Sequence, residues 1–327
     1  MPLISVIIPV YNGENTIRET IVSVLNQTFS DLEVIVINDG SQDSTLEIIS
    51  SIRDSRLKVF SYPNANQAVS RNRGIALACG EYISFIDADD LWTPDKLEAQ
   101  FNALQEHPQA DVAYSWTNCI DEAGKFLRRG YYISVSGNVY KKLLLNNFLE
   151  NGSNPLIRRH ALAEVGGFEP SVVPAEDWDM YLRLANRYQF VGLAYPQILY
   201  RISPNSTSTN VSKMERGCLQ VIERNFSQVP ESLQYLKCRS LANLYKILTH
   251  RAIEGVPQKE RGLAAIRYLR LAVKNDPSLL QAKVIWKVLF KVALFNLLPT
   301  QQADAFLTRF NKLSDTSTLF GYLQLDC

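Results

Sequence analysis

The apolar residues of the first hundred positions alternate between two patterns. Short continuous runs, each bounded by polar or turn residues, predict four buried strands at residues 3–10, 34–37, 57–60 and 82–86. Between these runs, apolar residues recur every three or four positions, as on one face of a helix; Ile17, Ile21 and Val24 are the first example. Alternating strands and helices with short connections predict an α/β fold, with a mostly parallel sheet flanked by helices.

The rhythm changes after residue 110. We expect a strand at residues 112–116, a helix at 176–187 and two further strands at 190–194 and 198–202. From residue 213 onward nearly all of the chain has helical periodicity. We therefore predict three regions: residues 1–110, residues 111–212 and a helical C-terminal region, 213–327. With 327 residues, 46% of them apolar, the chain can form more than one packed unit.

Charge and cysteine content exclude several classes of function. The formal net charge is +1, which gives no indication of nucleic-acid binding. Five scattered cysteines without a C-x-x-C pair favour free thiols in a reducing compartment over a disulfide framework or a zinc site. No apolar run reaches the length that spans a bilayer, and a strand pattern begins at residue 3, so we expect a cytoplasmic protein.

A strongly apolar stretch runs from Val284 to Leu298 (VIWKVLFKVALFNLL, residues 284–298). Its ordinary interpretation is a core helix of the C-terminal region. Because Lys287 and Lys291 lie four residues apart on one face, a second interpretation is an interfacial helix that rests on the inner face of a membrane. The sequence leaves both interpretations open.

Three carboxylates follow the fourth predicted strand: Asp87, Asp89 and Asp90. In open α/β sheets, ligands bind beyond the carboxyl ends of the strands. Asp87 and Asp89 are two residues apart, so their side chains point the same way on an extended chain. Mg²⁺ and similar cations are held by one or two carboxylates together with phosphate oxygens. Alone, the pattern is also typical of a solvated turn or a helix cap.

Other predicted strand ends carry polar turns that would open onto the same crevice. Residues 9–14 (PVYNGE) follow the first strand, and Asp39 follows the second, where a carboxylate can accept hydrogen bonds from a base or a ribose. Arg71 lies near a third junction, and arginine is suited to phosphate or to stacking. Further along, Glu176 and Asp177 open a helix. Acids are favoured there by the helix dipole, and one of them could also act as a general base.

The order and spacing of these motifs resemble those of the family 2 glycosyltransferases with the GT-A fold. The matching segments, within roughly residues 3–210, are SVIIPVYN (5–12), NDGSQDST (38–45), SRNRGI (70–75), GEYISFIDADD (80–90), VGGF (165–168) and AEDWDMYLRL (175–184). The resemblance implies an inverting, non-processive enzyme. It would transfer a sugar from a nucleotide-diphosphate donor, usually a UDP-sugar, to a hydroxyl of a glycan or lipid-linked acceptor.

Residue by residue, the resemblance implies a donor site and a catalytic site. The residues of the donor site would be Pro9, Tyr11, Glu14, Asp39, Arg71, Asp87 and Asp89. Asp39 would contact the base, Asp87 the ribose or the metal, and Asp89 would coordinate Mn²⁺ or Mg²⁺ at the diphosphate. Asp177 would be the catalytic base, with Glu176 beside it near the acceptor. Such a metal neutralises the leaving group as a Lewis acid, and the base removes a proton from the incoming hydroxyl.

Two departures from the family pattern matter. Many relatives carry a histidine shortly after a tyrosine–arginine pair, whereas Ser203 stands here after Tyr200 and Arg201, which leaves a further metal or phosphate contact without its usual residue. Residues 203–210 (SPNSTSTN) can still form a mobile lid. The chain has no Q-x-x-R-W sequence, which argues against processive polymer synthesis.

Three other functions are alternatives to glycosyl transfer. A nucleotidyltransferase or a dinucleotide oxidoreductase would carry a glycine-rich loop after the first strand, and residues 9–14 lack one. The remaining alternative is a non-catalytic scaffold that keeps a nucleotide-sugar pocket. On the acceptor side, we expect the basic and aromatic segment at residues 125–160 to contribute, and its side chains suit a sugar ring and a lipid diphosphate equally.

Overall fold

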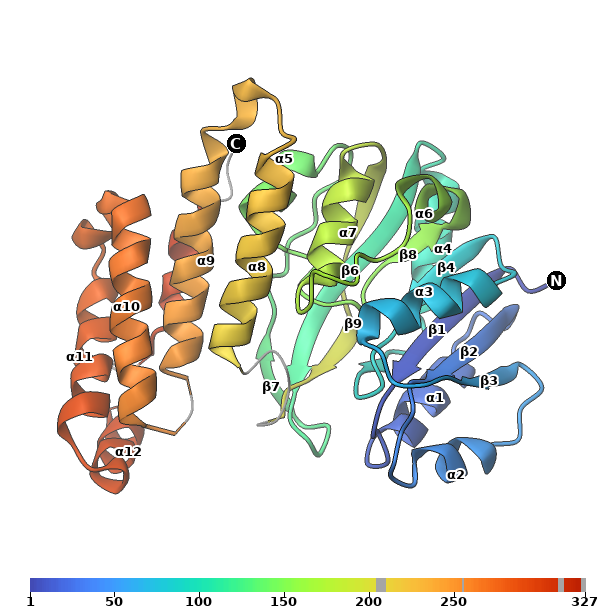
Figure 1. Cartoon of the computed structure of the whole chain (residues 1–327), viewed down its shortest axis with the longest axis horizontal. Helices are drawn as coiled ribbons and strands as arrows, with labels where there is room; N and C mark the ends of the chain where they lie inside the picture. Colours follow the sequence, from blue (N-terminus) through green and yellow to red (C-terminus); the bar gives the residue numbers. More distant parts are fainter. Residues whose placement is uncertain (204–209, 255, 311–314, 325–327) are drawn as a thin grey trace. The chain divides into compact units, whose positions relative to one another are not determined.

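The computed structural model describes residues 1–203, 210–254, 256–310 and 315–324, and it divides into two compact units (Figure 1). The first unit contains Met1–Leu143 and continues from Asn147 to the end of strand β9. The second contains Leu144–Asn146 and the helices from α8 onward. The division of the first unit near residue 110 stays a prediction.

A nine-stranded sheet forms the centre of the first unit. Its strands are β1 (Ile4–Val10), β2 (Leu32–Asn38), β3 (Leu57–Ser61), β4 (Tyr82–Phe85), β5 (Leu91–Trp92), β6 (Ala110–Ile120), β7 (Phe126–Arg129), β8 (Leu156–Arg158) and β9 (Gln189–Arg201). Their order is β3-β2-β1-β4-β8-β6-β9-β5, and β7 pairs with β6. The first four strands in this order are parallel, whereas β8 is antiparallel to both β4 and β6. The predicted α/β fold is confirmed, with a sheet that is parallel in its N-terminal half and mixed beyond it.

Burial on both faces explains the continuous apolar runs of the parallel half. Strands β1 and β2 are buried along their whole length. On β1, Ile4, Val6 and Ile8 join one core with residues of α1 (Ile17–Leu25) and α4 (Lys96–Glu106). Ile7 meets α3 (Gln67–Leu77) on the other face, where a Cβ on Gly74 would lie 2.3 Å from the Ile7 side chain. A strand covered on both sides has no polar alternation.

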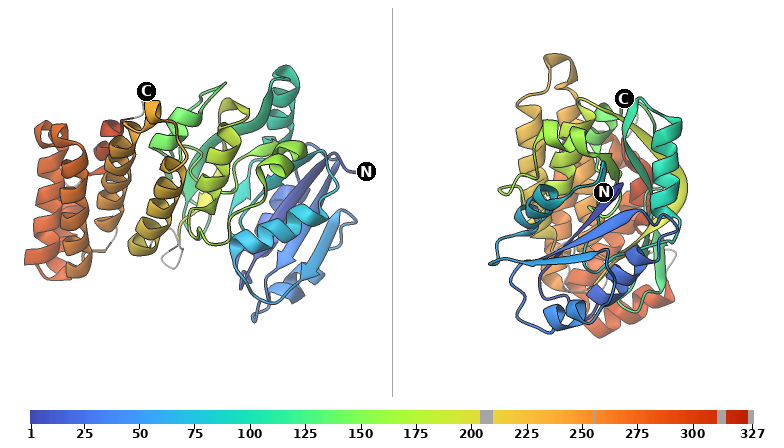
Figure 2. Two further views of the ribbon diagram at one scale, coloured as in Figure 1. Left: turned by 45° about the horizontal axis from the view of Figure 1, so that its top comes forward. Right: turned by 90° about the vertical axis from the view of Figure 1, so that its right-hand side faces the viewer.

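The remaining helices of the first unit flank this sheet. They are α2 (Thr45–Ser50), α5 (Tyr140–Leu145), which runs into the second unit, α6 (Arg159–Val165) and α7 (Glu176–Ala185). Figure 2 shows the parallel strands side by side, with α3 over one face and α1 and α2 over the other. The predicted helix at 176–187 is therefore α7, and the predicted strands of the first hundred residues are all present.

Strand β9 is one continuous strand, so the prediction of two separate strands at 190–194 and 198–202 was wrong. Its register against β6 shifts between Tyr114 and Trp116 and again between Trp116 and Thr117. Pro196 pairs with Trp116 at this irregularity. A bulge accommodates a proline because that residue has no N–H to donate to the ladder. The proline therefore interrupts the sequence pattern without ending the strand.

The second unit is helical, as predicted from residue 213 onward. Its elements are α8 (Val211–Phe226), α9 (Leu236–Ala252), α10 (Lys259–Asn275), α11 (Val284–Leu297), α12 (Thr300–Arg309) and the 3₁₀ turns η2 (Glu231–Leu233), η3 (Pro277–Gln281) and η4 (Ser317–Tyr322). Buried Lys246 of α9 donates to Asp276 at 2.6 Å and to the carbonyl of Tyr322 at 2.8 Å, which holds η4 against the helices. No helix in the described part of the chain is long and apolar enough to cross a bilayer.

Candidate active site

The three carboxylates after β4 lie in different environments. Asp90 is fully buried, and it accepts hydrogen bonds from the hydroxyl of Ser153 and from the backbone N–H of Arg201, at 2.9 Å for the latter. Burial, followed by the charges of Asp89 and Asp87, raises the pKa of Asp90. Asp90 therefore fixes the end of β9 and the loop before β8. Asp87 and Asp89 are only half-buried.

The Asp89 carboxylate is the least constrained of the three. No other residue in the described ranges donates a hydrogen bond to it, whereas Nε of Arg201 binds the Asp89 backbone carbonyl at 2.7 Å. Burial and then the charge of Asp87 raise the pKa of Asp89 to about 6. A nearby positive charge would relieve this penalty, because opposite charges favour the ionised form.

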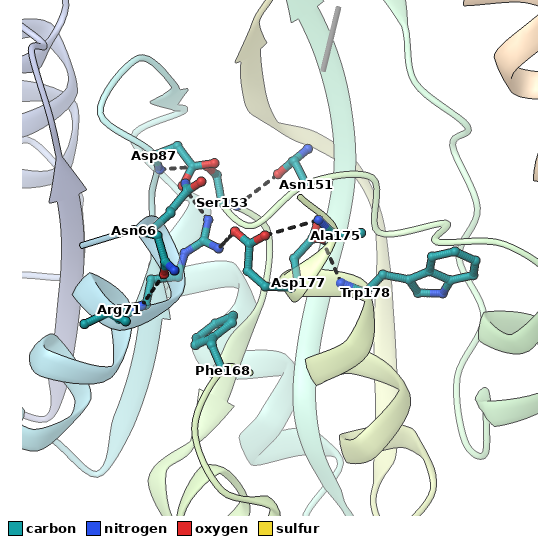
Figure 3. Close-up of polar contacts among 12 residues, drawn as sticks. Asn66, Arg71, Asp87, Asn151, Ser153, Phe168, Ala175, Asp177 and Trp178 are labelled. Atoms are coloured by element: carbon teal, nitrogen blue, oxygen red, sulfur yellow. Dashed lines mark hydrogen bonds and ion pairs between the residues drawn. The ribbon is translucent and has the colours of Figure 1, made fainter. Parts of the chain in front are cut away.

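Arg71 connects the end of β4 to the first turn of α7. Its Nη2 lies 2.6 Å from Oδ1 of Asp87, and its Nη1 lies 2.7 Å from Oε1 of Glu176. The side chain is only 1% exposed, and the guanidinium lies 5.1 Å from the ring centroid of Phe168. Burial opposes its charge, but Asp87 and Glu176 outweigh burial and raise the pKa of Arg71. Figure 3 shows Arg71 beside Asp87, with Asp177 at the start of α7.

The two acids at the start of α7 are held differently. Glu176 is buried and, besides its contact with Arg71, accepts a hydrogen bond from the N–H of Ala175 at 3.1 Å. Asp177 is half-buried, and its Oδ2 accepts from the amide of Asn147 at 3.2 Å. Burial, followed by the charge of Glu176, raises the pKa of Asp177 to about 7, although Arg71 acts in the opposite direction. A carboxyl group with a pKa near neutrality is suited to proton exchange at pH 7.

The loop before β8 organises this site, although nothing in its sequence pattern singled it out. Ser153 accepts a hydrogen bond from the N–H of Asp87 at 2.9 Å and donates to Asp90. Gly152 lies against Arg71, because a Cβ at this position would be 2.2 Å from Nη2. The local sequence NGSN is typical of any turn. Its role becomes visible only once the fold brings it to the end of β4.

The residues predicted to line the nucleotide pocket lie where β1 ends. Pro9 is within β1, and Tyr11 is 51% exposed and accessible to a ligand. Glu14 is exposed, and its carboxylate accepts a hydrogen bond from the N–H of Ser44 at 3.0 Å, just before α2. Glu14 therefore stabilises the start of that helix, since a carboxylate there binds an unpaired N–H.

Asp39, at the end of β2, is buried and already holds protein partners. Its carboxylate accepts from the N–H of Ala65 at 3.1 Å and from Nη1 of Arg73 at 2.9 Å. Arg73 in turn lies over the ring of Tyr62, 4.6 Å from its centroid. The structure thus brings Arg71, Asp87 and Glu176 into direct contact, whereas Asp39 belongs to a separate group with Arg73. The predicted lid at residues 203–210 falls almost wholly outside the described residues.

Asp87 and Asp89 fit a hard cation that takes further ligands from phosphate and water. Within the described ranges, no three or more His, Cys, Asp or Glu side chains are grouped to hold a metal ion. Oδ1 of Asp87 is occupied by Arg71 and, at 2.7 Å, by Nε2 of Gln67. Asp89 has a raised pKa and accepts no hydrogen bond from another residue in the described ranges, so it is the carboxylate best suited to a cation.

Most of the chain is similar to known glycosyltransferases. Residues 5–251 match the model of the family described as "Glycosyltransferase like family 2". A protein of Rickettsia bellii described as an uncharacterized glycosyltransferase is 34% identical over 67% of this chain and 31% of its own length. A chondroitin synthase of Pasteurella multocida is 29% identical over 70% of this chain and 24% of its own length. The chain thus matches less than two thirds of either relative.

Two solved structures share the fold at low sequence identity. The mannosyltransferase PcManGT from Pyrobaculum calidifontis, in complex with GDP-Man and Mn²⁺, has a TM-score of 0.59 and 18% identity, over 99% of this chain and 85% of that one. Residues 1–349 of S. aureus TarS, in complex with UDP, have a TM-score of 0.53 and 21% identity, over 86% of this chain and 92% of that one. The predicted GT-A fold is therefore confirmed. On the match of residues 5–251, the chain belongs to glycosyltransferase family 2.

Proposed function

We propose that this glycosyltransferase moves a hexose from a nucleotide-diphosphate donor, preferentially a UDP-sugar, to an acceptor hydroxyl with inversion. The observation that carries the proposal is the Arg71 bridge. It joins Asp87, at the strand end expected to meet the donor, to Glu176, which directly precedes the candidate base Asp177. A donor-side carboxylate and a proton acceptor are thereby held in one charged cluster.

Asp177 acts as the general base in this proposal. As the acceptor oxygen attacks the anomeric carbon, its proton passes to the Asp177 carboxylate, and the nucleotide diphosphate leaves from the opposite side of that carbon. Attack opposite the leaving group inverts the anomeric configuration. A pKa of about 7 supports the role, because the group is ionised at slightly alkaline pH and still basic enough to take a proton. Glu176 and Arg71 are positioning residues.

The donor would lie at the ends of β1, β2 and β4. Exposed Tyr11 is suited to contact with the nucleotide base, together with Pro9, Glu14 and the group around Asp39. The preference for UDP is supported by the family pattern and by the UDP complex of TarS, whereas PcManGT was solved with GDP-Man. Divalent metal dependence is supported by the Mn²⁺ in the PcManGT complex. Asp89, assisted by Asp87, would hold Mn²⁺ or Mg²⁺, which supplies Lewis-acid stabilisation of the departing diphosphate.

The acceptor in this proposal is a glycan or a lipid-linked glycan of polysaccharide biosynthesis, which the chondroitin synthase among the relatives supports. Trp116 and Tyr132 stack with ring centroids 4.4 Å apart, and Arg129 lies over Tyr132. A stacked aromatic pair with a cation beside it suits a sugar ring. The proposal places the enzyme in the cytoplasm, with peripheral contact of residues 284–298 at the inner membrane face.

Calorimetric titration with UDP, GDP and dTDP, each with and without Mn²⁺, tests the donor half of this proposal. We expect Mn²⁺-dependent binding of one nucleotide, and loss of that dependence in Asp89→Ala. Asp54→Ala, which removes an acid paired with Arg56 before β3, is the control and should bind as wild type does. Absence of binding to all three nucleotides would overturn the proposal. If nucleotide binds but Asp177→Asn changes no function, the scaffold alternative is correct instead.

A further inference from the structure

The two parts of the chain carry opposite charges, although the total is almost neutral. Residues 211–327 contain 17 lysines and arginines and nine aspartates and glutamates, a formal net charge of +8. Residues 1–210 contain 17 basic and 24 acidic residues, a net charge of −7. Such an asymmetry between parts of one chain indicates that the basic part meets an anionic surface.

One face of α11, in the basic unit, is apolar and exposed. The exposed residues of this helix are Trp286, Leu289, Ala293 and Leu297. Their spacing of three and four positions places them on one face. Trp286 is 72% exposed and Leu297 is 79% exposed, whereas Val288 and Val292 on the opposite side are buried. One side of α11 therefore packs in the core of the second unit, and the other side is exposed at its surface.

This exposed face continues onto α12 and is bordered by basic residues. Phe290 of α11 contacts Phe306 of α12 with ring centroids 5.9 Å apart, and Phe306 contacts Phe310 at 4.7 Å. Phe306 and Phe310 are more than one third exposed. Three lysines lie beside this face: Lys283, just before α11, is exposed, and Lys287 and Lys291, on the adjacent stripe of the helix, are half-buried. Long lysine side chains can lie along an apolar surface while their ammonium groups reach phosphates.

We infer that the exposed face of α11 and α12 binds the surface of an anionic phospholipid bilayer. An apolar face with a tryptophan and flanking lysines is typical of a helix that lies in the membrane interface. With 14 residues, α11 is too short to span the bilayer, so it would lie in its plane. Nucleic acid would match the positive charge but offers no acyl layer for Trp286 and Leu297. The inference deepens the proposed function. Only the link to a lipid-linked acceptor rests on that function, and binding to the bilayer surface does not depend on it.

Sedimentation of the whole chain with phospholipid vesicles tests this surface directly. We expect binding to vesicles rich in phosphatidylglycerol, weaker binding to pure phosphatidylcholine, and a decrease as salt rises. Leu289→Glu should reduce binding about tenfold, because it places a carboxylate in the apolar face. Leu46→Glu, on α2, is matched in side chain, in charge change and in exposure, at 42% against 41%, and should bind as wild type does.

Tryptophan fluorescence provides a second measurement that does not depend on transfer. Trp92 and Trp178 are buried and Trp116 is half-buried, so Trp286 should account for a blue shift of emission on anionic vesicles. The shift should disappear in Trp286→Phe, which keeps the apolar face. Failure of wild type to sediment with anionic vesicles, or equal binding of Leu289→Glu, would overturn the inference. It would also be overturned by a lipid-free oligomer that Leu289→Glu dissociates, since the face would then join copies of the chain. Nucleotide binding is unaffected by any of these outcomes.

Discussion

Asp87 and Glu176 share one guanidinium: Arg71 binds the first at 2.6 Å and the second at 2.7 Å. Asp87 follows strand β4, whereas Glu176 opens helix α7. Arg71 is buried, and its charge is balanced by both carboxylates. A displacement of Asp87 would therefore change the charge balance at Glu176, and a displacement of Glu176 would change it at Asp87. The loop that carries Asp87 and the helix that carries Asp177 are therefore one electrostatic unit.

Replacing Arg71 removes the counter-charge of two carboxylates at once. Breaking a buried ion pair by deleting one partner costs about 3–5 kcal/mol, and we expect Arg71→Met to lose about 3 kcal/mol of unfolding free energy, because Asp87 keeps some contact with water. Arg71→Lys should not restore it, since one ammonium cannot bind both carboxylates in the same geometry. Urea unfolding measures the effect. Arg18→Met, which removes an exposed arginine, is the control, and equal stability of Arg71→Met and Arg18→Met would contradict the bridge.

Gly152→Ala tests the same bridge without changing any charge. The added methyl would lie 2.2 Å from Nη2 of Arg71, so the guanidinium must move away from Asp87 or the loop must shift. We expect a lower unfolding midpoint and weaker nucleotide binding. Gly321→Ala, where an added Cβ meets nothing within 4 Å, should leave both unchanged. Wild-type behaviour of Gly152→Ala would show that the arginine is not tightly held.

The pH dependence of transfer should report on Asp177. A general base works only when ionised, so a pKa of about 7 predicts that the rate falls as the pH drops through neutrality. The charge of Glu176 helps to raise this pKa, so Glu176→Gln should move the acidic limb of the kcat/KM profile to lower pH. Glu47→Gln, an exposed acid in α2, should leave the limb in place. If the acidic limb does not move in Glu176→Gln, the titration of Asp177 does not cause the pH dependence.

Tyr132 tests the acceptor side. Its ring stacks on Trp116, and its hydroxyl donates to Oδ1 of Asn118 at 2.6 Å. We expect Tyr132→Ala to raise the acceptor KM several-fold, on the order of the 0.5–1.5 kcal/mol that an aromatic pair contributes, and to leave nucleotide affinity unchanged. Tyr132→Phe should keep most of the effect of the ring. An unchanged acceptor KM in Tyr132→Ala would remove the stack from the acceptor site.

The sequence allowed prediction of the parallel half of the sheet and not of its pairing beyond β4. Continuous apolar runs such as β1 identify a strand buried on both faces, because that pattern is local. The contacts of Ser153 with Asp87 and Asp90 join residues more than 60 positions apart, and no local pattern encodes them. The motif SRNRGI (70–75) indicated Arg71 as a candidate donor-site residue. Its binding to Asp87 and Glu176 depends on how α3 and α7 meet.

In the proposed mechanism, Asp177 takes the acceptor proton, and other residues, at the ends of β1, β2 and β4, bind the donor. The direct test compares wild type with Asp177→Asn, using whichever of UDP-GlcNAc, UDP-glucose and GDP-mannose binds, and measures both donor affinity and release of the nucleoside diphosphate. Asparagine keeps the shape but cannot accept the proton, and general-base catalysis contributes about 10²–10⁴-fold. We therefore predict unchanged donor affinity and a release rate at least about a hundredfold lower. An undiminished rate in Asp177→Asn would contradict the account.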